Sequence, residues 1–86
     1  MPENADKWSF DRAYDGGDLA CGQLLLDLRL YFRDLPEDAV VMVRSVDEGA
    51  PVEIPAWCRL MGHMLLDSAH PRYLIRKRSN PTQPTP

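Results

Sequence analysis

Apolar and polar residues follow two different periods in the first half of the chain. Residues 8–14 begin with an alternation at Trp8 and Phe10 and lead into Asp-Gly-Gly-Asp at 15–18, which predicts a short strand and then a loop. Large apolar residues then recur at steps of three and four, which predicts an amphipathic helix from Gly22 to Leu35, with Leu24, Leu25, Leu28, Tyr31, Phe32 and Leu35 on its buried face. Pro36 ends this helix, and the apolar run 39–43 predicts a buried strand.

The second predicted helix covers residues 54–63. Its apolar residues are spaced i, i+3, i+4 and i+7 and share one helix face: Ile54, Trp57, Cys58 and Met61. Pro55 fits the first turn, where a missing N–H costs nothing, and Gly62 is a natural left-handed stop.

Two more strands, residues 63–66 and 72–76, are predicted on either side of a turn at 67–71, with Tyr73 and Ile75 on one face. The element order is therefore β-α-β-α-β-β. Because both helices must bury their apolar faces against the sheet, we expect an α/β fold, a two-layer α/β sandwich. Its sheet is expected to be mixed and four-stranded, with both helices on one face.

The composition indicates one small domain, residues 8–78. The ends, 1–7 and 79–86, are polar or proline-rich, and we expect both to be disordered. The 86 residues contain no apolar run long enough to span a membrane, the N-terminus has no signal pattern, and two cysteines are too few for a disulfide scaffold. We therefore expect a cytoplasmic protein that does not bind membranes, with reduced thiols.

The formal net charge of −3 conceals a segregation of charge along the chain. All 13 acidic residues lie in residues 1–67 with six basic ones, whereas residues 68–86 hold four basic residues and no acidic one: Arg72, Arg76, Lys77 and Arg78. A nucleic-acid-binding domain usually spreads many more cations over one face. Direct nucleic-acid binding is therefore not expected, although contact of this basic strip with RNA stays open as a third hypothesis.

Cys21 is the candidate nucleophile because it lies after the loop at 15–18 and directly before the first helix. A thiolate at a helix N-terminus is stabilised by unpaired N–H groups and by the helix dipole, which lower its pKa. Asp15 and Asp18 oppose this effect, since nearby negative charge raises a thiol pKa. A small apolar residue that happens to fall at a helix start is the alternative interpretation.

Cys58 is predicted to be a buried core thiol, because it lies in the apolar stripe of the second helix beside Trp57. Cys58, His63 and His70 are possible zinc ligands by type, but their spacing matches no common zinc framework and a fourth ligand is missing. We therefore expect neither a metal nor an organic cofactor.

Leu26 and Leu30 lie one turn apart on the first helix, off its apolar stripe and next to Arg29 and Arg33. Such a pair is either tolerated at the surface or forms a docking patch for a protein partner. The pattern alone leaves both interpretations open.

With these residues in place, the chain resembles the TusA/SirA-like family of small sulfur-carrier proteins over roughly residues 19–77. Three stretches carry the resemblance: Leu-Ala-Cys at 19–21, Ile-Pro-Ala-Trp-Cys-Arg-Leu-Met-Gly-His-Met-Leu at 54–65, and Arg-Tyr-Leu-Ile-Arg-Lys at 72–77. The resemblance implies the same sandwich and a cysteine that carries sulfur as a persulfide. The sulfur would come from a donor such as a cysteine desulfurase or a rhodanese and pass to an acceptor protein, in tRNA thiolation, cofactor biosynthesis or sulfur metabolism.

On that resemblance Cys21 is the carrier, Arg29 and Asp47 are candidate partner contacts, and Cys58 matches a family cysteine that is not the usual carrier. The protein would act as a monomeric sulfurtransferase without a cofactor. The family motif is Cys-Pro-x-Pro, whereas residues 21–24 read Cys-Gly-Gln-Leu, and Asp18 replaces the usual glycine. The alternative is therefore an interaction or regulatory module that keeps the fold without sulfur transfer.

Overall fold

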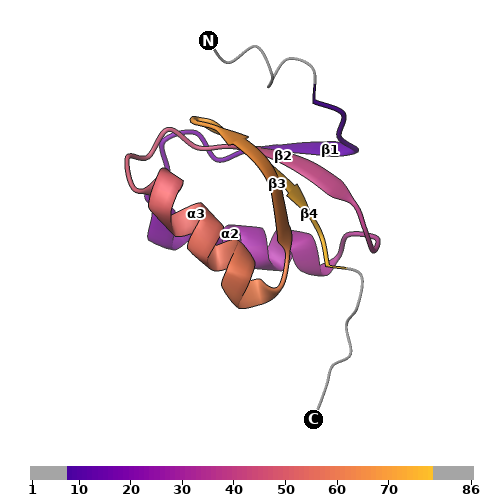
Figure 1. Cartoon of the computed structure of the whole chain (residues 1–86). Coiled ribbons are helices and arrows are strands. Elements are labelled where there is room, and N and C mark those ends of the chain that lie inside the picture. Colours follow the sequence, from indigo (N-terminus) through magenta and orange to yellow (C-terminus); the bar gives the residue numbers. More distant parts are fainter. Residues whose placement is uncertain (1–7, 79–86) are drawn as a thin grey trace.

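The computed structural model describes residues 8–78 and contains two helices and four strands. The elements follow the predicted order: β1 (Arg12–Asp15), α2 (Cys21–Arg33), β2 (Val40–Arg44), α3 (Ala50–Met61), β3 (Met64–Ala69) and β4 (Arg72–Arg76). Both helices lie on one face of the sheet (Figure 1). The predicted two-layer α/β sandwich is confirmed, while the tails at 1–7 and 79–86 lie outside the described residues.

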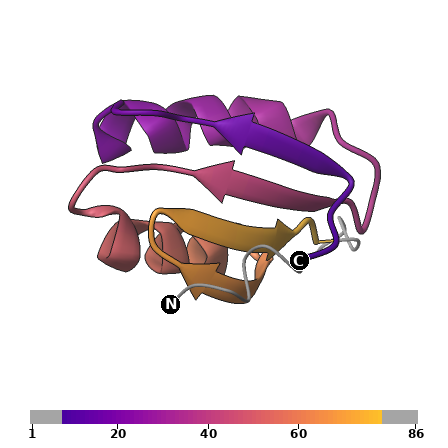
Figure 2. The ribbon, with the colours of Figure 1, turned by 90° about the horizontal axis from the view of Figure 1, so that it is seen from above.

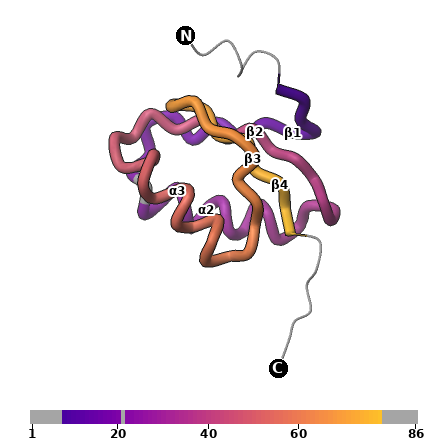
Figure 3. The backbone as a smooth tube through the Cα atoms, in the orientation of Figure 1, coloured from indigo at the N-terminus to yellow at the C-terminus, as the bar shows by residue number. Residues whose placement is uncertain are grey.

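The strand order across the sheet is β1-β2-β4-β3, and Figure 2 shows the strands side by side from above. β1 pairs with β2 in parallel, and β4 pairs antiparallel with both β2 and β3. β3 therefore runs parallel to β1 and β2, with β4 inserted between two parallel strands. Each helix crosses from one parallel strand to another, as the backbone trace shows (Figure 3). This topology brings the carboxyl ends of β1, β2 and β3 to one end of the molecule.

The core lies between the sheet and the helices. Its fully buried side chains come from both layers and include Leu24, Leu28, Phe32, Val41, Val43, Ile54, Tyr73 and Ile75. The three-and-four spacing predicted this face of α2, and Tyr73 and Ile75 share the buried face of β4 as expected. Phe32 packs edge-on against Trp57, with ring centroids 5.5 Å apart, which joins the two helices.

The first strand is shorter and later than predicted. The alternation at Trp8 and Phe10 indicated a strand over 8–14, but β1 spans Arg12–Asp15. Residues 8–10 instead lie over the face of the sheet opposite the helices (Figures 1 and 2), where the Trp8 indole N–H donates to an Asp67 carboxylate oxygen at 3.2 Å. Asp11 N–H already donates to the Val40 carbonyl of β2 at 2.8 Å. The alternation of Trp8 and Phe10 therefore reflects a segment that covers the sheet and not a strand that pairs with it.

The second helix begins four residues earlier than predicted. Its first turn contains Pro51, so Pro55 lies inside the helix and not in the first turn as expected. Pro55 has no N–H for the carbonyl four residues before it, which removes one helical hydrogen bond. Gly62 closes the helix with φ 81°, as predicted, and its left-handed conformation favours glycine.

The last two strands are joined more tightly than predicted. β3 continues to Ala69, so only His70 and Pro71 separate it from β4, whereas the sequence indicated a turn over 67–71. The register between β3 and β4 shifts between Leu65 and Asp67. The sequence prediction ended the strand at residue 66 because residues 67–71 were interpreted as a turn, whereas 67–69 continue the strand beyond this irregularity.

Candidate functional site

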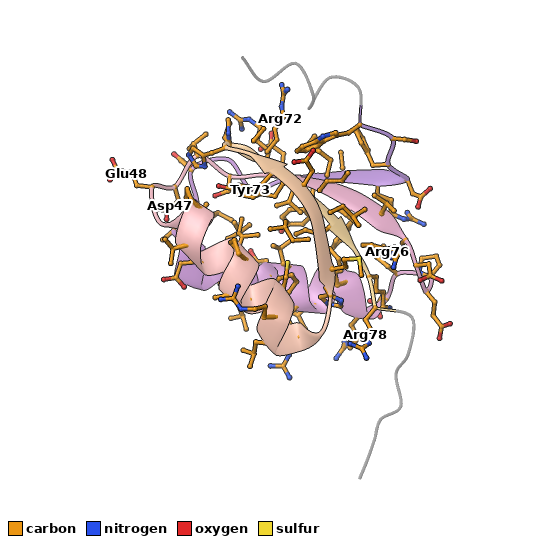
Figure 4. The ribbon with its side chains drawn as sticks, viewed as in Figure 1. Asp47, Glu48, Arg72, Tyr73, Arg76 and Arg78 are labelled. Carbon is orange, nitrogen blue, oxygen red and sulfur yellow. The ribbon has the colours of Figure 1, made fainter. Side chains whose placement is uncertain are left out.

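The candidate site lies where the carboxyl ends of the three parallel strands meet the starts of both helices. We call this the helix-start end, and it comprises the loops 16–20 and 45–49. The loops are joined directly, because Val46 N–H donates to the Gly17 carbonyl at 3.0 Å. The second loop is also tied to the β3–β4 turn, since Ser45 N–H donates to the Pro71 carbonyl at 2.8 Å. Asp47 and Glu48 lie here beside the first turn of α3 (Figure 4).

Gly16 sets the position at which the chain leaves β1 for α2. Its N–H donates to the Arg44 carbonyl at 2.8 Å, which extends the pairing of β1 with β2. A Cβ atom at Gly16 would lie 2.5 Å from Cδ1 of the buried Leu24 and 3.1 Å from the Arg44 carbonyl oxygen. Only glycine allows the loop to pass this close to the first turn of α2.

Asp15 is paired at the end of β1. Its carboxylate accepts hydrogen bonds from the Arg44 guanidinium and from Gly17 N–H, both at 2.9 Å. The bond from Arg44, followed by that from Gly17, lowers the Asp15 pKa below its usual value. The Arg44 charge thus offsets the Asp15 charge, which was one of the two that opposed a thiolate at the start of α2.

Helix α2 begins at Cys21 without a capping side chain. Ala20, in an extended conformation with φ −63° and ψ 149°, is the N-cap residue and makes no side-chain hydrogen bond. The first turn contains no acidic residue. The first intrahelical bond runs from Leu24 N–H to the Ala20 carbonyl, at 2.9 Å. The N–H groups before it, at residues 21–23, therefore point along the helix axis toward any anion bound at this end.

The structure places the predicted partner residues in two groups. Leu26 and Leu30 are about half exposed, at 53% and 51%, and lie with the exposed Arg29 on the outer surface of α2. Asp47 lies at the helix-start end with Cys21, whose own side chain is outside the described part of the structure. The Asp47 carboxylate accepts a hydrogen bond from Gly49 N–H at 2.9 Å, so it has a local role in starting α3.

Cys58 is buried, with 2% of its surface exposed, as predicted for a core thiol. Burial raises its pKa to about 12, so the thiol stays protonated at neutral pH. Among the described side chains of residues 8–78, which do not include that of Cys21, no group of three or more His, Cys, Asp or Glu is arranged to hold a metal ion. His70 instead hydrogen-bonds through Nδ1 with the Tyr73 hydroxyl.

The sequence did not indicate a basic cleft at the opposite end of the molecule. Arg72 lies at the helix-start end, whereas Arg76 and Arg78 lie at the far end of β4, so the basic strip is divided between two sites (Figure 4). At the far end, Arg76, Lys77 and Arg78 join Arg59 of α3 around one cleft. Sequence spacing could not predict this, because Arg59 is remote from the others along the chain.

No protein-family model matches the chain. The resemblance to the TusA/SirA-like family therefore stays a prediction that rests on the residues quoted above. Neither helix in the described residues has the length and apolar character that a membrane span requires.

Proposed function

We propose that the protein carries sulfur as a persulfide on Cys21. The position of Cys21 at the uncapped start of α2 is the observation that supports this proposal most directly. A persulfide or thiolate there would accept hydrogen bonds from the N–H groups of the first turn and would face the positive end of the helix dipole. The chemistry needs an accessible thiolate and a docked partner rather than a deep pocket, which suits a domain of this size.

The transfer is balanced without an oxidant. The Cys21 thiolate attacks the outer sulfur of a persulfide on the donor protein, a new S–S bond forms to Cys21, and the donor cysteine leaves as a thiolate. In the second step a thiolate of the acceptor protein attacks the outer sulfur on Cys21, and Cys21 leaves as a thiolate. Each step exchanges one S–S bond for another, so the sulfur oxidation states balance.

The exposed outer surface of α2 supplies the proposed docking surface for donor and acceptor. Leu26, Leu30 and Arg29 follow Cys21 along the same helix, and Asp47 lies at the end where the helix begins. Half-exposed leucines beside an arginine combine an apolar contact surface with a guanidinium that can form hydrogen bonds, a composition common in protein interfaces.

Incubation with a cysteine desulfurase and free cysteine, followed by intact mass measurement without reductant, tests the proposal. We expect wild-type protein and Cys58→Ala to gain the mass of one sulfur atom and Cys21→Ala to gain none. Absence of added sulfur on wild type, or equal labelling of Cys21→Ala, would contradict sulfur transfer.

The alternative is an interaction module that has lost sulfur transfer, and the exposed Leu26–Leu30 pair favours it, because this surface does not depend on the thiol. In that case Cys21→Ser leaves partner capture and the cellular phenotype intact, whereas Leu26→Asp abolishes capture. Under the carrier proposal both variants lose sulfur transfer and with it the cellular phenotype, although only Leu26→Asp loses binding. The phenotype of Cys21→Ser therefore separates the two functions.

A further inference from the structure

A cleft of about 530 Å³ opens at the end of the molecule where both helices and β4 finish. Four cationic side chains line it, from α3 and from the end of β4: Arg59, Arg76, Lys77 and Arg78. Asp38 is the one carboxylate that lines it within residues 8–78. We call this the basic cleft. Its volume falls in the range typical of small-molecule sites.

Hydrogen bonds to the backbone hold two of these cations in place. Lys77 Nζ donates to the carbonyl oxygens of Arg33 and Leu35 at the end of α2. Arg78 donates through its guanidinium to the Gly62 carbonyl at 3.3 Å and through its backbone N–H to His63 Nδ1 at 3.1 Å. The Lys77 and Arg78 charges are therefore positioned before any ligand arrives, which reduces the ordering cost of binding for these two side chains.

The cations are not neutralised by acidic side chains. The described part of the chain contains two ion pairs, Arg33 with Asp34 and Arg44 with Asp15, and neither involves a cation of the basic cleft. The C-termini of α2 and α3 offset part of the charge, since each is equivalent to about −0.5. After Asp38 and both helix ends are subtracted from four cations, a surplus of about +2 remains.

A narrower apolar pocket of about 200 Å³ adjoins the basic cleft and shares His63 and Lys77 with it. Phe32 and Met61 contribute its apolar walls, and Arg29 and Arg33 of α2 complete its lining. The His63 ring packs against two aromatic rings that also contact each other, with its centroid 4.9 Å from that of Phe32 and 5.3 Å from that of Trp57. A dry cavity of roughly 150 Å³ is sufficient for a benzene-sized group.

We propose that the basic cleft and the adjoining pocket together bind a small phosphomonoester whose organic part is a compact aromatic or apolar group. A phosphomonoester carries a charge of about −1.5 to −2 at neutral pH, which matches the surplus charge of the cleft. Its phosphate lies among Arg59, Arg76 and Arg78, where arginine can bind two oxygens at once. The organic group occupies the pocket beside Met61. The phosphate would bind at the opposite end of α2 from Cys21, while Arg29, a proposed partner contact of the sulfur carrier, lines the adjoining pocket. Ligand binding at this site does not require the Cys21 thiol.

Titration of the full chain with phenyl phosphate, inorganic phosphate and phenol, followed by two-dimensional NMR of backbone amides, tests the proposal. We expect saturable shifts at Gly62, His63 and Arg78 with phenyl phosphate, and affinity about tenfold lower for inorganic phosphate because the ring is absent. Phenol should give no saturable shift. If a single-stranded RNA oligonucleotide shifts these amides while phenyl phosphate does not, the cleft is a nucleic-acid site and the proposal is wrong.

Charge variants provide the matched control. Arg59→Gln and Arg76→Gln each remove a surface cation of the cleft without creating a cavity, and each should weaken phenyl phosphate binding by about tenfold. Arg44→Gln removes the same charge at the helix-start end and should leave the affinity unchanged. An equal loss of phenyl phosphate affinity in all three variants would show that only the net charge of the protein matters, and would overturn the assigned site. The absence of amide shifts at millimolar phenyl phosphate would also overturn it.

Discussion

Helices α2 and α3 start at the same end of the sheet and each carries one cysteine, but their starts are built differently. At α3, the Asp47 carboxylate accepts from Gly49 N–H, the Asp47 carbonyl accepts from Ala50 N–H at 3.0 Å, and Pro51 lies in the first turn. At α2 the N-cap residue is alanine, which makes no side-chain cap hydrogen bond, and Cys21 is the first helical residue.

Gly49, the N-cap residue of α3, likewise makes no side-chain cap hydrogen bond, so the difference is that Asp47 pairs with the N–H groups of Gly49 and Ala50, whereas Ala20 provides no side-chain acceptor at α2. A helix without a capping side chain gives up stability that Ser, Thr, Asp or Asn would supply at that position. In return, no side chain of the N-cap residue competes for the N–H groups beside Cys21. The second cysteine, Cys58, lies in the interior of α3 within the core, where burial suppresses ionisation. Four predictions test this contrast.

The largest expected difference is in the reactivity of the two thiols. With a pKa of about 12, Cys58 is about a thousandfold less ionised at pH 8 than an ordinary thiol of pKa ~8.5, and burial slows its reaction further. We expect a disulfide reagent at pH 8 to label one thiol per native chain, at Cys21, and to label Cys58 only after unfolding.

Cys21→Ala and Cys58→Ala separate the two reactions, because each retains a single thiol. The time course for Cys21→Ala should follow unfolding of the chain, and that for Cys58→Ala should be complete within the fast phase. Fast labelling of native Cys21→Ala would show that Cys58 is accessible and would remove the contrast.

The next largest effect is expected at the glycine that brings the loop close to α2. Gly16→Ala places a Cβ 2.5 Å from the buried Leu24 side chain and 3.1 Å from a backbone carbonyl, so it should destabilise the fold by about 2 kcal/mol. Gly22→Ala is the control, because a Cβ at Gly22 would meet no atom within 4 Å. It should be neutral or stabilising by up to ~1 kcal/mol. Urea midpoints that fall equally in both variants would contradict close packing at Gly16.

The architecture was largely predictable because it depends on periodic burial. The three-and-four spacing that ends at Pro36 identified α2, and the β-branched run identified β2. The predicted starts of β1 and α3 were wrong because a local sequence feature suggested a boundary that the hydrogen bonds of the fold do not follow. Trp8 and Phe10 alternate like a strand yet lie across the sheet, and Pro55 suggested a helix start although hydrogen bonds to residues 47–49 begin the helix earlier.

The candidate site was predictable only where it depends on chain position. Cys21 at a helix start and Cys58 in an apolar stripe follow from spacing alone. The pairing of Asp15 with Arg44 needs the parallel register of β1 and β2, which a single sequence does not specify. The basic cleft requires α3 and β4 to finish at the same end, so its cations are scattered along the chain and form no motif.

Exchanging the two kinds of helix start should shift stability by about 1 kcal/mol in opposite directions. Asp47 lies before the N-cap residue Gly49, and Asp47→Ala removes the side-chain acceptor for Gly49 N–H, so it should destabilise the protein by about that amount. Ala20→Ser adds an acceptor at an extended N-cap residue and should stabilise it by a similar amount. The added acceptor also competes for the N–H groups beside Cys21, so the Cys21 pKa should rise. Thermal midpoints measure the change in stability, and the pH dependence of Cys21 labelling measures the change in pKa. If Ala20→Ser is more stable but its labelling is unchanged, the N–H groups at the start of α2 do not influence the Cys21 thiol.

The smallest effect is expected at the far end of α3, where His63 follows the left-handed Gly62. Burial, and then the positive charges of Lys77 and Arg78, lower the His63 pKa below its ordinary value of 6.5. The unfolded chain therefore binds more protons than the folded chain as pH falls through 6.5, so the stability contributed by neutral His63 is present above that pH and is lost below it. Urea midpoints should decrease between pH 7 and pH 5, and His63→Gln should flatten this slope whatever its effect at pH 7. The lowered pKa of Asp15 acts only below about pH 4 and does not enter this window. An unchanged slope in His63→Gln would show that the ring does not titrate differently in the folded and unfolded chains.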